Sequence, residues 1–205
     1  TGTRNSAFGA MVTGFYTGPL AANTTGSSNS AFGAAALNAN TTGSYNSAVG
    51  EGALFANTTA NYNTAVGYQA AYSNITGNIL DAFGAQTMYS NTTGASNVAF
   101  GSLGLYSNTT GSYNTAVGRQ ALYSNTTGSG NIAVGYQAAY LNQTGTYNNA
   151  VGLQSLYSNV SGNNNNAFGY AALGSNTGSN NVAIGHQALT FNLSLIHISE
   201  PTRPE

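Results

Sequence analysis

Large apolar residues recur within one short motif, in which Ala is followed by Val, Phe or Ile and then by Gly. The glycines of this motif are Gly9, Gly33, Gly50, Gly67, Gly84, Gly101, Gly118, Gly135, Gly152, Gly169 and Gly185. The step from one to the next is long once, then constant at seventeen for eight consecutive steps, and then shorter by one. A register held this long is the signature of a repeat protein, whose units stack on one another.

We number the positions of each repeat from this anchor glycine, which is position zero. Position −2 is always Ala, position −1 is always a large apolar residue, position +4 is mostly Leu, and position +7 is Asn throughout. Position +10 is Gly except at Ala60, and position −4 is Asn except at Leu80. Residues 114–130 form a representative unit, whose predicted ladder residues are Ala116, Val117, Gly118, Leu122, Asn125 and Gly128.

Each unit contains two segments that favour an extended backbone. The first is Asn-Thr-Ala-Val-Gly and the second is roughly Gln-Ala-Leu-Tyr-Ser, which is too short to be a stable helix. The Asn-Thr-Thr-Gly loop between them has turn chemistry. The pattern predicts an all-β fold, a parallel β-solenoid (β-roll) of about eleven 17-residue coils, each about 4.8 Å from the next.

The alternation of side chains along a strand predicts which columns lie inside. We expect Ala116 and Leu122 to fill the coil, because the Ala column never changes size and a packed interior tolerates volume changes poorly. We expect Val117 and its equivalents to point outward. Stacking should align the position +7 asparagines and the position +5 tyrosines into ladders. An outward apolar stripe should be covered by another chain, which predicts a parallel homo-oligomer.

Composition narrows the class of function. Only 3% of the 205 residues are charged, the formal net charge is −1, and there is no cysteine. A nucleic-acid binder would need a basic patch, and a membrane helix would need about twenty apolar residues in a row. The sequence has neither, so we expect no nucleic-acid partner, no membrane span and no disulfide framework.

The residues that could support catalysis or bind a metal are few and scattered. Glu51 and Asp81 fall in different columns about two coils apart, and His186 and His197 have no clustered acids. We therefore expect no enzyme activity, no cofactor and no metal. Asn-x-Ser/Thr sequons recur at position +7, and we interpret them as inward-pointing turn residues and not as glycosylation sites. They are Asn40, Asn57, Asn74, Asn91, Asn108, Asn125, Asn142 and Asn159.

The two ends of the chain differ from the array. The long first step indicates an insertion near residues 10–18, which we interpret as a tolerated bulge. The chain starts within a coil and without Met, which indicates a fragment. Residues 1–192 form the predicted array. Residues 193–205 leave the repeat and resemble the translation of a sequencing-library adapter, so we expect a non-native tail.

The motif at 114–118, read with Asn-Ser-Ala-Phe-Gly at 5–9 and Asn-Val-Ala-Ile-Gly at 181–185, resembles the head repeats of YadA-like trimeric autotransporter adhesins. It is also similar to the repeat arrays of tail-fibre-domain proteins and phage tail fibres. The resemblance implies a left-handed β-roll, a parallel homotrimer, an extracellular location on a cell surface or virion fibre, and an adhesive or spacer role toward a host-surface or matrix ligand. The period of seventeen is longer than that of typical adhesin heads.

Two other classes remain as alternatives. An ice-binding β-solenoid presents regular threonine arrays, and this chain has adjacent loop threonines that should point opposite ways and leave one column. An enzyme built on a β-solenoid would need a cleft of clustered acids, bases or histidines, which the sequence does not offer.

Overall fold

The computed structural model describes residues 2–9 and 18–191. The predicted insertion, except Gly18, and the predicted non-native tail lie outside these described residues. Within them, strands and turns make up the whole structure and no helix is present.

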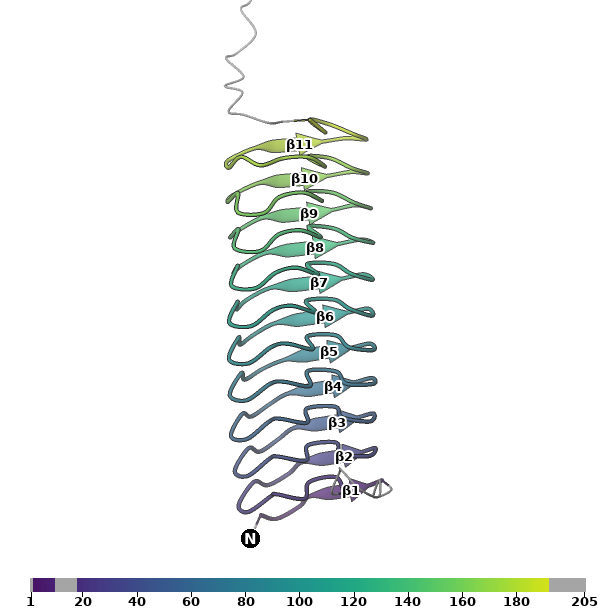
Figure 1. The fold of residues 1–205 in the computed structure, drawn as a ribbon, viewed down its shortest axis with the longest axis vertical. Helices are drawn as coiled ribbons and strands as arrows, with labels where there is room; N and C mark the ends of the chain where they lie inside the picture. Colours follow the sequence, from purple (N-terminus) through teal and green to yellow (C-terminus); the bar gives the residue numbers. More distant parts are fainter. Residues whose placement is uncertain (1, 10–17, 192–205) are drawn as a thin grey trace, which may run out of the picture.

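Eleven three-residue strands form one parallel sheet in strict chain order (Figure 1). Their bounds are β1 Ser6–Phe8, β2 Ser30–Phe32, β3 Ser47–Val49, β4 Thr64–Val66, β5 Asp81–Phe83, β6 Val98–Phe100, β7 Thr115–Val117, β8 Ile132–Val134, β9 Asn149–Val151, β10 Asn166–Phe168 and β11 Val182–Ile184. The chain is therefore a parallel β-solenoid of about nine turns of some 17 residues, which confirms the predicted fold class.

The register of the sheet follows the anchor motif. Ala116 of β7 pairs with Ala99 of β6 and with Ala133 of β8. In the same way Ala7 of β1 pairs with Ala31 of β2, although the chain between these two strands is longer than in any other coil. The motif, and not the distance along the chain, therefore fixes the register.

The core is a narrow interior filled by small and medium side chains. Ala116 and Leu122 are fully buried, whereas Val117 keeps 37% of its surface exposed. The same pattern of buried Ala and outward apolar residue holds from β2 to β11. The predicted inward and outward columns agree with the structure.

The segment after each anchor glycine, which we call the return segment, is not the second strand that the sequence predicts. It is a run of turns in which positions +2 and +4 have left-handed backbone angles, for example Gln69 (φ 51°) and Ala71 (φ 51°). Gln69 N donates to Glu51 O of the preceding coil (2.8 Å), and Ala71 N donates to Thr87 O of the following coil (2.9 Å). The N–H groups at positions +2 and +4 thus bond to opposite neighbouring coils, and these bonds offset a cost of about 1–2 kcal/mol for each left-handed residue.

Only glycine fits at the anchor position, because the backbone φ angle is one that other residues rarely adopt and because there is no room for a Cβ. Gly118 has φ 132°, and a Cβ there would lie 2.5 Å from the carbonyl oxygen of Gly135 in the next coil. Coils therefore approach one another backbone to backbone at this corner, where no side chain fits.

Two asparagine ladders run through the interior. At position +7, Asn125 Nδ2 donates to Asn108 Oδ1 (2.8 Å) and to Gly128 O within its own loop (3.0 Å). At position −4, the backbone N of Asn131 donates to Asn114 Oδ1 (3.0 Å). Sequence reasoning predicted the first ladder and missed the second, although the recurrence of Asn at position −4 was visible.

Candidate functional site

The acidic and histidine side chains of the described residues do not gather into a site. No group of three His, Cys, Asp or Glu residues in the described part of the chain could hold a metal ion. Glu51 is exposed at position +1, and Asp81 lies on the outer side of β5. His186 stacks on Tyr170 with ring centroids 5.0 Å apart. In the same residues no helix is long and apolar enough to cross a membrane.

The outer face of the sheet carries a line of apolar side chains, one from each strand, which we call the apolar stripe. Phe83 and Phe100 stack within it, with ring centroids 4.7 Å apart. Its members from β2 onward are Phe32, Val49, Val66, Phe83, Phe100, Val117, Val134, Val151, Phe168 and Ile184. Most are more than a third exposed, as in Val49 (42%) and Phe100 (43%). A continuous exposed apolar line of this length is unusual on a monomer.

A second column lies on the return segment, at position +5, and we call it the aromatic stack. Consecutive rings lie 4.8 to 5.3 Å apart and within 10° of parallel. Its members are Phe55, Tyr72, Tyr89, Tyr106, Tyr123, Tyr140 and Tyr157. Burial, followed by the charges of Tyr140 and Tyr106, raises the pKa of Tyr123 above its ordinary value. The predicted tyrosine ladder is therefore present, and its rings are only half-buried.

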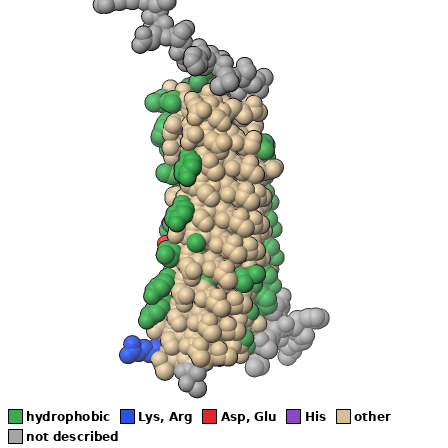
Figure 2. All heavy atoms as spheres, turned by 90° about the vertical axis from the view of Figure 1, so that its left-hand side faces the viewer, with side chains coloured by type: hydrophobic (Ala, Val, Ile, Leu, Met, Phe, Trp, Pro, Cys, Tyr) green, Lys and Arg blue, Asp and Glu red, His purple; other side chains and the backbone are tan. Residues whose placement is uncertain are grey.

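The loop side of the solenoid is mainly polar and is bordered by hydrophobic side chains (Figure 2). Tyr45 and Tyr62 stack at position +12 with ring centroids 5.0 Å apart and are more than half exposed. The threonines of the loop divide into two kinds. Those at position +8 use their hydroxyls between coils, as when Thr41 Oγ1 donates to Thr58 O (3.0 Å), whereas those at position +9, such as Thr42, are exposed.

The sequon asparagines are the buried ladder of position +7. Asn40, Asn91 and Asn142, like the other five, have no exposed surface. Their amides are bonded within the interior, so the folded coil leaves them out of reach of glycosylation. This agrees with their interpretation as inward-pointing turn residues.

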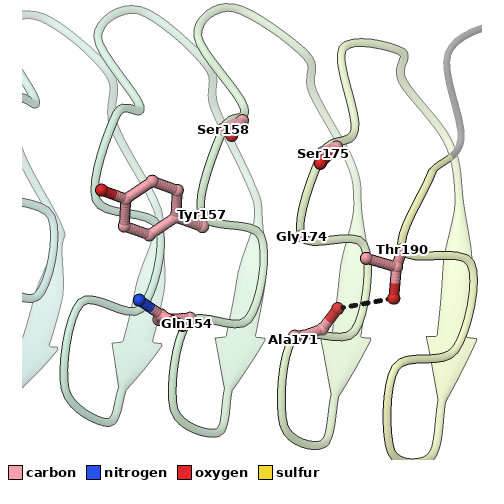
Figure 3. Close-up of a pocket in the computed structure, with 7 residues that line it drawn as sticks. All are labelled: Gln154, Tyr157, Ser158, Ala171, Gly174, Ser175 and Thr190. Carbon is pink, nitrogen blue, oxygen red and sulfur yellow. Dashed lines mark hydrogen bonds between the residues drawn. The ribbon is translucent and has the colours of Figure 1, made fainter.

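A small cavity of about 350 Å³ opens on the return segment near the last coils. Its lining, drawn in Figure 3, consists of Gln154, Tyr157, Ser158, Ala171, Gly174, Ser175 and Thr190. All seven occupy position +2, +5 or +6 after an anchor glycine, in three consecutive coils. Sequence reasoning placed Tyr157 in the tyrosine ladder but did not single out the other six residues, although the column of aromatic residues visibly ends at Gly174.

Comparison of the chain with protein-family models, with curated proteins and with solved structures finds no match. The structure alone therefore defines the class of protein, which is a β-solenoid repeat protein.

Proposed function

We propose that this chain is a non-catalytic structural and adhesive rod of an extracellular surface protein, comparable to an adhesin head or a tail fibre. In this proposal three copies associate in parallel along their apolar stripes, on a cell surface or a virion fibre. Contacts to a host-surface or matrix ligand are made by the exposed columns.

The observation that carries the proposal is the apolar stripe. Its side chains follow one another from β2 to β11 on the outer face of every strand, at the spacing of the coils. Burying apolar surface contributes roughly 25 cal/mol per Å², so covering such a line with identical lines from parallel copies is favourable. A parallel arrangement places each strand of one copy beside the equivalent strand of another, which suits a closed symmetric oligomer.

The sparse charge supports the same proposal. Glu51, Asp81, Arg4 and Arg119 are the acids and basic residues within the described part of the chain, and they are spread over different coils. The stripe therefore meets no run of like charges that would repel a second copy. A rod with uncharged repeated columns offers many equivalent weak contacts, which suits adhesion through multivalency.

Sedimentation equilibrium tests the proposal. We expect the native chain to sediment with three times its chain mass, and the paired change Val117→Lys with Val134→Lys to give monomers. The matched control, Thr127→Lys with Thr144→Lys, places the same charges in the same two coils on the exposed threonine column and should leave the trimer intact. A native chain that stays monomeric at all concentrations would contradict the proposal.

An ice-binding role is the alternative, and one observation favours it. The position +9 threonines form an exposed column, which comprises Thr42, Thr59, Thr76, Thr93, Thr110, Thr127 and Thr144. The position +8 hydroxyls are occupied between coils, so this is a single column and not a two-dimensional array. Thermal hysteresis of the purified chain, lost on changing Thr93 and Thr110 to Val, would favour this alternative.

A further inference from the structure

The aromatic stack and a glutamine ladder end at the same coil. Tyr157 is the last ring, because Gly174 takes the next position +5 and offers no side chain. Gln154 is the last glutamine of its run, because Ala171 takes the next position +2. The cavity lies at this shared end, which we call the notch (Figure 3).

The notch lies where one ring of the aromatic stack is missing. Rings in the stack lie about 5 Å apart, as in Tyr140 and Tyr157 (5.2 Å). Tyr157 and Thr190 occupy position +5 two coils apart, with Gly174 between them. A flat ring placed above Gly174 would therefore stack on the open face of Tyr157 and be bounded on its other side by Thr190.

The polar groups at the rim of the notch are neutral, and three of their oxygen atoms make no hydrogen bond within the described residues. Gln154 Nε2 donates to Gln137 Oε1 (3.1 Å), which leaves Gln154 Oε1 at the rim with no hydrogen-bond partner among the described residues. The Oγ atoms of Ser158 and Ser175 likewise make no hydrogen bond within those residues. Thr190 Oγ1 is already engaged with Gln187 O (2.7 Å) and Ala171 O (3.3 Å).

We propose that the notch binds one ring of a neutral saccharide. The C–H face of a pyranose carries partial positive charge and stacks on the negative face of a tyrosine ring. Its hydroxyls can donate to Gln154 Oε1 and both donate to and accept from Ser158 and Ser175. None of the seven lining residues is charged, so an anionic ligand such as a nucleotide finds no counter-charge. Aromatic side chains beside a few convergent polar groups are common in small-ligand sites.

Saturation-transfer NMR with the full chain tests this site. The probes are three neutral trisaccharides, cellotriose, maltotriose and chitotriose, with adenosine as a planar aromatic comparison. We expect saturable binding of at least one trisaccharide. Tyr157→Ala, which removes the stacking face, should weaken it at least tenfold. Tyr113→Ala, which removes an exposed tyrosine on the loop side (72% exposed), should leave it unchanged.

A second variant, which fills the notch, distinguishes loss of the binding site from loss of binding through unfolding. Gly174→Tyr adds the missing ring, and its Cβ would lie 3.1 Å from Ala171 O and 3.6 Å from Thr190 Cγ2, a tight but tolerable fit. We expect it to abolish saccharide binding without lowering the melting temperature. Binding that persists in Gly174→Tyr, or saturable binding of adenosine alone, would overturn the proposal, as would no binding of any trisaccharide to the native chain. The notch lies on the return segment and the apolar stripe on the strands, so this result and the oligomeric state are independent.

Discussion

The two sides of each three-residue strand differ in how much they vary. On the inner side Ala recurs in every coil and is buried from Ala31 to Ala183. On the outer side, Val, Phe and Ile exchange freely at the position next to it. The inner side is closely packed against the Leu column, whereas the outer side faces open space. The difference indicates that inward columns specify the coil, and that outward columns are free to carry binding.

The largest expected loss of stability comes from adding a side chain at the anchor glycine, where consecutive coils touch. Gly118→Ala places a Cβ 2.5 Å from Gly135 O at a backbone angle that favours glycine, and should lower the free energy of unfolding by about 3 kcal/mol or more. Urea denaturation measures it. Gly104→Ala is the matched control, because a Cβ there meets nothing closer than 3.4 Å and other coils carry Ala at position +3. Equal stability of the two variants would contradict the role of the anchor.

The second-largest loss of stability is expected when an asparagine of the position +7 ladder is replaced. Asn125→Ala leaves Asn108 Oδ1 without its donor and deprives Asn142 Nδ2 of its acceptor Asn125 Oδ1, whereas Gly128 O keeps its bond from Asn114 Nδ2. Each buried polar group that loses its hydrogen-bond partner costs about 1–3 kcal/mol. We therefore expect the free energy of unfolding to fall by about 3 kcal/mol in the same urea denaturation experiment. Gln143→Ala, a change of an exposed loop side chain, should stay within about 0.5 kcal/mol. A small effect at Asn125 would mean that the ladder is not stabilising.

The sharpest comparison of the two sides uses neighbouring residues. Ala116→Val enlarges a fully buried side chain, and overpacking of this kind should cost about 2 kcal/mol. Val117→Phe is a larger increase in volume, yet it should cost nothing, because Phe is native in this column and would stack on Phe100 as Phe83 does. Melting temperatures of the two variants measure the difference, and the opposite ranking would reverse the inferred orientation of the strand.

The smallest expected effect depends on pH. The raised pKa of Tyr123 means that folding favours its protonated hydroxyl. Its contribution is fully present below the ordinary tyrosine pKa of about 10 and is lost as the pH rises through the raised folded value. Thermal unfolding between about pH 9 and about pH 12 should show this loss, and Tyr123→Phe should reduce it. An identical alkaline profile for the variant would exclude Tyr123 as a contributor.

The columns were predictable because burial in a stacked coil follows directly from alternation and constant size, as Ala116, Leu122 and Asn125 illustrate. The return segment was not predictable. Leu54 and Gln69 ordinarily avoid a left-handed backbone, and the hydrogen bonds that compensate for it come from other coils. The notch was not predicted either, because the sequence shows that the tyrosine ladder ends at Gly174 but does not show which side chains of the neighbouring coils surround the gap.

Whether the apolar stripes of parallel copies meet is tested most directly by a single cysteine. The chain has none of its own, and Val49 lies near one end of the stripe with 42% of its surface exposed. In a parallel trimer each Val49 lies beside the same residue of another copy, so oxidation of Val49→Cys should give covalent dimers within every trimer. Thr59→Cys, on the exposed threonine column of the coil that follows Val49, should not cross-link. Absence of cross-linking in Val49→Cys, or cross-linking only when Val49→Cys is combined with Phe168→Cys as an antiparallel pairing requires, would contradict the account.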